Sequence, residues 1–150
     1  MLRHHRRGRR GPAALHPYRE VVRQRTAVAA VAAGGALGAT ARFGVGQLIS
    51  WQPPGFPWAT ALVNVSGCLL IGGVLGWLLA SAGQPAWLRP FIATGVLGGY
   101  TTFSAFAVES VVLVDSGAAS TAAVYVASTV LLGLLAVRVG ARAVQRLKGA

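Results

Sequence analysis

The residues best suited to chemistry in this sequence lie together between Gly98 and Phe106, inside an apolar run from Pro90 to Val114. The run is long enough to cross a bilayer, yet its centre holds paired glycines and adjacent threonines, which fit a helix interior poorly. Backbone that leaves helical geometry at membrane depth exposes N–H and C=O groups, which protein, water or an ion must satisfy. We therefore predict a broken helix at the functional centre, with the carbonyls of Gly98 to Thr101 facing a cation.

Aromatic side chains follow this predicted break directly. Phe103 and Phe106 stand on one helical face, and Glu109 continues that face one turn later. The edge of a phenylalanine ring carries partial positive charge, so two rings turned edge-on attract an anion weakly. A stripe of aromatic residues more often serves packing, and both interpretations are open at this point.

Other polar side chains interrupt the apolar runs. Hydrogen-bond donors occur at Asn64, Ser104, Tyr125 and Thr129, and Arg42 places a cation where charge is expensive. Such donors commonly bond across membrane helices, and Arg42 could be a snorkelling anchor. Alternatively, the donors replace part of the water shell of a small anion, and Arg42 draws anions inward. This set favours a narrow anion path.

Catalysis has little support in the sequence. We find no nucleophile beside a base, no pair of His or Cys at ligand spacing and no glycine-rich turn between strand and helix. The protein is therefore expected not to be an enzyme.

Composition places the chain among polytopic membrane proteins. Of its 150 residues, 54% are hydrophobic and only 11% are charged, whereas soluble domains carry about a quarter charged residues. The 14 Lys and Arg against three acids would suggest nucleic acid as partner in a soluble protein. Here most of the cations flank apolar runs, as cytoplasmic anchors do, so we expect membrane lipid and no nucleic acid.

Four apolar runs predict an all-α membrane protein with four transmembrane helices and a break in the third. The expected spans are residues 27–49, 59–79, 90–114 and 118–137. Residues 1–25 are expected to form a disordered basic cytoplasmic arm, 26–142 the channel domain and 143–150 a short basic tail.

Charge placement predicts the orientation of these spans. Arg3, Arg6, Arg7, Arg9, Arg10, Arg19, Arg23, Arg25, Arg138, Arg142, Arg146 and Lys148 lie in the two tails, and Arg89 flanks the second loop. The first and third loops contain no Lys or Arg. Because cytoplasmic loops carry the excess of Lys and Arg, both termini should be cytoplasmic in the cell membrane.

Three motifs stand out along the apolar runs: GGALGATARF at residues 34–43, ATALVNVSG at 59–67 and GGYTTFSAF at 98–106. Together they resemble the Fluc (CrcB-type) fluoride channel family, and Glu109 lies where that family places a glutamate. The resemblance covers nearly all of residues 34–137. The function it implies is passive export of fluoride, which lowers fluoride toxicity.

The resemblance also implies an assembly and roles for individual residues. The expected assembly is an antiparallel, dual-topology dimer with two narrow fluoride pores at its interface and a central sodium ion. Asn64, Phe103 and Phe106 would line the pores, with Ser104, Tyr125 and Thr129 as further anion-facing groups. Gly98 and Thr101 would supply backbone carbonyls to sodium, and Arg42 and Glu109 would lie at the vestibule.

The strong charge bias leaves two assemblies and two rival functions open. An inverted copy of this chain would work against its bias, so a homodimer and a heterodimer with an oppositely oriented paralogue have comparable weight. One rival function is a small proton-coupled transporter, which needs an ionisable acid in the membrane, such as Glu109 or Asp115. The other is a non-conducting partner subunit of a heterodimeric channel.

Overall fold

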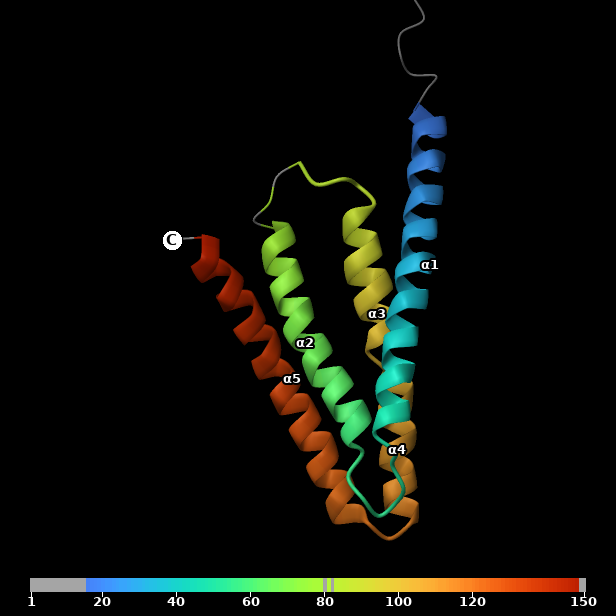
Figure 1. Cartoon of the computed structure of the whole chain (residues 1–150), viewed down its shortest axis with the longest axis vertical. Helices are drawn as coiled ribbons and strands as arrows, with labels where there is room; N and C mark the ends of the chain where they lie inside the picture. Colours follow the sequence, from blue (N-terminus) through green and yellow to red (C-terminus); the bar gives the residue numbers. More distant parts are fainter. Residues whose placement is uncertain (1–15, 80, 82, 149–150) are drawn as a thin grey trace, which may run out of the picture.

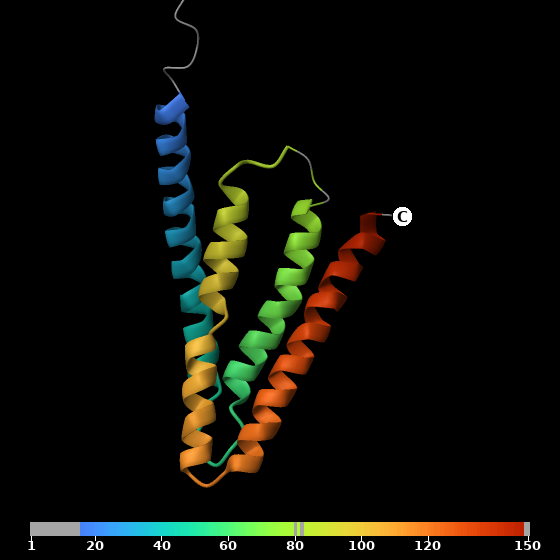
Figure 2. The ribbon, with the colours of Figure 1, turned by 180° about the vertical axis from the view of Figure 1, so that it is seen from behind.

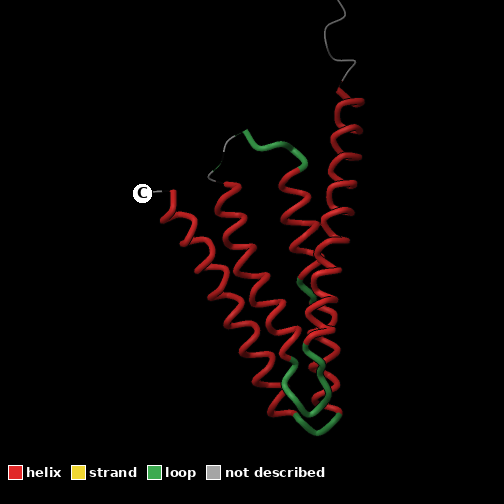
Figure 3. Tube along the Cα trace, in the orientation of Figure 1, coloured by secondary structure: helices red, strands yellow, loops and turns green. Residues whose placement is uncertain are grey.

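The computed structural model describes residues 16–79, 81 and 83–148. Its elements are α1 (His16–Leu48), α2 (Trp58–Leu79), η2 (Pro90–Leu97, a π-helix), α3 (Gly98–Tyr100), α4 (Phe103–Asp115) and α5 (Ala119–Lys148). Figure 3 shows helices joined by short loops throughout this part of the chain. Four stretches are long and apolar enough to cross a membrane, and the third combines η2, α3 and α4. The prediction of an all-α membrane protein with a broken third span is confirmed.

The four spans form two close pairs that spread apart at one end. In both views, α2 lies between α5 and the first half of the third span, and α1 runs along the outer side of that half (Figures 1 and 2). The pairs converge where the loops at 49–57 and 116–118 lie. The end of α5 and the loop residues 83–89 lie toward the other end (Figure 1).

Glycines set the distance between the helices of each pair. A Cβ added at Gly34 or Gly38 would collide with backbone of η2, at the carbonyls of Phe91 and Val96. These two residues have the small-xxx-small spacing that predicts close approach, and the prediction is confirmed. In the other pair, Gly72 of α2 faces the carbonyl of Val137 in the same way.

The buried core lies at the converging end of the bundle. Leu113 and Tyr125 are fully buried there, together with Ala61, Ala118 and Ala122. Trp51, Phe56 and Phe106 pack against this cluster. The core therefore fixes the C-terminal part of α4 against α5, and Phe106 extends this packing toward the break in the third span.

Both terminal helices are longer than we predicted. The first begins at His16, so the expectation of a disordered arm is wrong for residues 16–25, while residues 1–15 lie outside the described part. The last continues to Lys148, so residues 143–148 are helical. Hydropathy marks where a helix leaves the bilayer, but Arg, Gln and Glu are good helix formers and let it continue into water.

Candidate functional site

The break in the third span is made by two threonines. Thr101 has φ −73° and ψ 158°, and Thr102 has φ −146° and ψ 121°, so both are extended. We predicted a break between Gly98 and Phe106, with the paired glycines and the adjacent threonines both unsuited to a helix, and of these Gly98–Tyr100 remain helical. Gly99 instead touches α1, where an added Cβ would lie 2.5 Å from the carbonyl oxygen of Gly35. The glycine is needed for packing, and the threonines form the break.

Side chains satisfy the backbone groups that the break releases. Asn64 Nδ2 donates to the carbonyl of Thr102 at 2.9 Å, and the Thr102 amide donates to Asn64 Oδ1 at 2.9 Å. Thr102 Oγ1 accepts from the Ala105 amide at 3.1 Å and so caps α4. Asn64 therefore serves as structural glue between α2 and the break, one of the two roles we considered for it.

The same amide lines a groove that gathers four of the predicted anion-facing residues. Asn64 of α2, Phe103 and Phe106 of α4 and Thr129 of α5 line this groove, whose volume is about 260 Å³. Cys68, Val130, Gly133, Leu134 and Val137 complete the lining. Phe103 is 81% exposed, and its ring centroid lies 6.1 Å from that of Phe106. The aromatic pair thus forms one wall of an open, mostly apolar channel surface.

Thr129 gives this groove an unusual polar group. The residue is only 8% exposed, and its Oγ1 has no hydrogen-bond partner among the described residues. Threonine hydroxyls in membrane helices ordinarily bond a carbonyl one turn back, as Thr40 does to Ala36 at 2.8 Å. A buried hydroxyl left without a partner costs about 1–3 kcal/mol. Thr129 thus brings to the lining of the groove a buried hydroxyl that has no partner in the described part of the fold.

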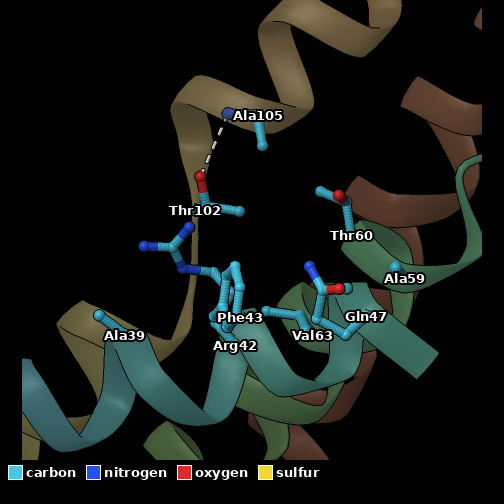
Figure 4. Close-up of a pocket in the computed structure, with 10 residues that line it drawn as sticks. Ala39, Arg42, Phe43, Gln47, Ala59, Thr60, Val63, Thr102 and Ala105 are labelled. Carbon is cyan, nitrogen blue, oxygen red and sulfur yellow. Dashed lines mark hydrogen bonds between the residues drawn. The ribbon is translucent and has the colours of Figure 1, made fainter. Parts of the chain in front are cut away.

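A second groove, of about 460 Å³, lies on the other side of the break. Arg42, Gln47, Thr60 and Thr102 are its polar lining, with Ala39, Phe43, Gly46, Ala59, Val63 and Ala105 (Figure 4). Arg42 is half-buried, and its Nε donates to the carbonyl of Gly99 at 3.1 Å. The arginine is thus bonded to protein within the bundle rather than snorkelling to the end of its helix.

Comparison with known proteins agrees with this geometry. Residues 29–141 match the family model described as "CrcB-like protein, Camphor Resistance (CrcB)". The chain belongs to the CrcB-like family. A relative from Hyphomonas neptunium, named fluoride-specific ion channel FluC, is 46% identical over 112 residues, covering 73% of this chain and 88% of the relative. A FluC from Rhodospirillum centenum is 51% identical over 110 residues, covering 71% and 86%.

Another relative of this CrcB-like chain comes from Streptomyces avermitilis and carries the name fluoride-specific ion channel FluC 2. It is 46% identical over 106 residues, which cover 71% of this chain and 67% of the relative. The names of all three relatives specify fluoride.

Tyr125 and Glu109 lie outside the first groove of this CrcB-like protein. Tyr125 is fully buried, its ring packs 5.1 Å from that of Phe106, and its hydroxyl donates to Glu109 Oε2 at 2.7 Å. Thr60 Oγ1 donates to the other carboxylate oxygen at 2.8 Å. The tyrosine thus reaches the groove only through the phenylalanine it supports. Glu109 does not line the second groove, but it bonds Thr60, which does.

Two residues of this family member remain to be placed: Ser104, which was predicted, and Thr60, which was not. Ser104 is exposed and meets the Thr102 hydroxyl at 3.3 Å, but it does not line the first groove. Sequence reasoning missed Thr60, which joins the second groove to Glu109. Its position one helical turn before Asn64 was the available signal, since residues four apart share a helix face.

Proposed function

We propose that this protein is the subunit of a passive fluoride channel that exports fluoride across the cell membrane. The observation that carries the proposal is the first groove, which is lined by Asn64, Phe103, Phe106 and Thr129, whose hydroxyl has no partner among the described residues. Membership of the CrcB-like family and relatives named fluoride-specific ion channels support the choice of ion. The proposal includes two cytoplasmic termini, because Lys and Arg cluster in both tails of the chain.

The groove has the chemistry that a small anion needs to leave water. Thr129 offers a hydroxyl donor, and Asn64 uses one amide hydrogen on Thr102 and has a second to offer. The edges of Phe103 and Phe106 add weak attraction without a fixed charge. Conduction requires binding that is favourable enough for entry and weak enough for release, and this set of neutral donors meets that condition.

One subunit does not enclose this path, so the proposal includes a dimer. Phe103 is 81% exposed, and the groove lies on the surface of the bundle. A second four-helix subunit laid antiparallel would cover it and complete two pores at the interface. The charge bias of this chain leaves a homodimer and a heterodimer with an inverted paralogue as the two candidate assemblies.

A structural sodium ion at the centre of that dimer is also proposed, and the backbone at the break fits it. In an unbroken helix, the amides of Thr102 and Ala105 would bond the carbonyls of Gly98 and Thr101. Here those amides donate to Asn64 Oδ1 and Thr102 Oγ1. The carbonyls of Gly98 and Thr101 thereby lose their helical hydrogen-bond donors. Their oxygens would be the ligands of a bound sodium ion.

Fluoride efflux from liposomes tests the function. The purified complex should release fluoride down its gradient with no proton gradient, and Phe106→Ile should slow the release while the assembly stays intact. Flux that requires a proton gradient would instead favour the rival transporter. Intact assemblies with unchanged flux after Phe103→Ile and Phe106→Ile would leave these rings as packing groups, as expected of a non-conducting subunit.

A further inference from the structure

The break in the third span is held from two sides, and only one of them is the asparagine already described. From α2, Asn64 bonds both backbone groups of Thr102. From α1, Arg42 Nε donates to the carbonyl of Gly99 at 3.1 Å. The two helices are otherwise paired with different partners, so the break is the point where side chains from both reach the same backbone segment.

The Gly99 carbonyl lies just before the break and therefore lacks the hydrogen-bond donor that a continuous helix would give it. In a continuous α-helix it would accept from the Phe103 amide, but the extended backbone of Thr101 and Thr102 separates these two residues. A carbonyl left without a partner inside a membrane bundle costs several kcal/mol. Arg42 supplies the donor across 57 positions of sequence. Its side chain rises beside Thr102 at the edge of the second groove (Figure 4).

We propose that Arg42 is a positioning residue, whose bond to Gly99 fixes the end of the first half of the third span and so the direction in which α4 presents Phe103 and Phe106. Close packing makes this bond specific. Gly38 lies one turn before Arg42 on α1, and an added Cβ there would collide with the Val96 carbonyl. The glycine contact brings the α1 backbone close enough for the arginine to reach Gly99. This role differs from attraction of anions, because it depends on the donor and not on the charge.

Two neutral variants separate the donor from the charge. Glutamine at position 42 places its Nε2–H₂ the same number of bonds from the backbone as arginine Nε, and methionine has similar length without a donor. Arg42→Lys keeps a charge and a donor and serves as the third variant. Hydrogen exchange of the amides in residues 101–106 is compared in the detergent-solubilised complex, with the α2–α5 seam around Gly72 as the internal control.

If the bond positions the break, these amides exchange about fivefold faster in Arg42→Met than in Arg42→Gln, the factor expected for one hydrogen bond. Equal exchange in the two variants would overturn the proposal. Exchange does not depend on fluoride transport, so it decides the matter even if the proposed function fails. If Arg42→Met does not fold and Arg42→Gln does, rescue by the neutral donor supports the proposal. If neither folds while Arg42→Lys does, charge is what matters and the proposal is overturned.

Fluoride efflux is the second readout, and it rests on the proposed function. Positioning predicts that Arg42→Gln carries more flux than Arg42→Met, and that the methionine variant leaks more chloride relative to fluoride because the rings are less well placed. If only Arg42→Lys carries flux and the two neutral variants are equal, anion attraction accounts for the arginine and the positioning role is overturned.

Discussion

Replacement of Thr129 by valine should move stability and transport in opposite directions. The Thr129 side chain is 92% buried, the complement of its 8% exposure, and its hydroxyl has no partner in the described part of the fold. Valine keeps the branched shape and removes the hydroxyl. Because an unsatisfied buried hydroxyl costs about 1–3 kcal/mol, the variant should unfold with a free energy higher by up to about that amount.

Transport should fall because the same hydroxyl is the donor that we propose the ion uses. A hydrogen bond to a charged group contributes about 1.5–3 kcal/mol, and each 1.4 kcal/mol is tenfold in rate. Loss of one such bond in the permeation path should therefore reduce fluoride flux roughly 10- to 100-fold. The expected combination is a complex that is as stable as the parent or more so, and that conducts poorly.

The assay is fluoride efflux from liposomes, run beside thermal unfolding of the same preparations in detergent. Ser128→Ala is the matched control, since Ser128 neighbours Thr129 on α5 and its hydroxyl bonds the Tyr125 carbonyl at 3.3 Å. That variant should keep its flux. Clear destabilisation of Thr129→Val would show that the hydroxyl has a partner in the fold. Unchanged flux would show that the ion does not use it, and either result refutes the reasoning.

Four further variants test other parts of the fold and the site. Gly34→Ala should prevent stable folding, because its Cβ would collide with η2 backbone, whereas Gly35→Ala has nothing within 4 Å and should be neutral or stabilising by up to about 1 kcal/mol; thermal unfolding compares them. Asn64→Ala should destabilise the complex by about 2 kcal/mol through loss of two hydrogen bonds at 2.9 Å, measured the same way, and an unchanged melting temperature would contradict the bracing role. Tyr125→Phe should cost about 1–3 kcal/mol, since it removes one of two donors to Glu109; calorimetry that finds no loss would show that water replaces the hydroxyl.

The sequence was sufficient for those features that depend on pattern alone. Hydropathy located four spans, and the spacing of Gly34 and Gly38 identified the face of α1 that packs against backbone. The predicted stretch Gly98–Phe106 contains the break, but the sequence did not separate the glycines from the threonines as its cause. A glycine in a membrane helix can mark either a break in the helix or a close contact with another helix. Only the position of Gly35 opposite Gly99 shows that the second explanation applies to Gly99.

Side-chain roles were harder to predict, because each polar residue in a membrane span has a structural use and a ligand-binding use. Thr129 and Tyr125 look alike in sequence, as two hydroxyl residues one turn apart on α5. In the fold, the Tyr125 hydroxyl donates to Glu109 and the Thr129 hydroxyl has no partner. Which of them is free depends on where Glu109 lies on another helix, and one helix's sequence does not contain that information.

Asn64 connects the two functions that the third span divides between its halves. Its side chain binds the Thr102 amide, which leaves the carbonyl of Gly98 without its helical donor on one side of the break. The same side chain lines the groove with Phe103 on the other side. The residue cannot move toward an ion in the groove without loosening the backbone that forms the carbonyl site. The proposed cation site and the proposed anion path therefore share Asn64, and we expect a change at this residue to affect both.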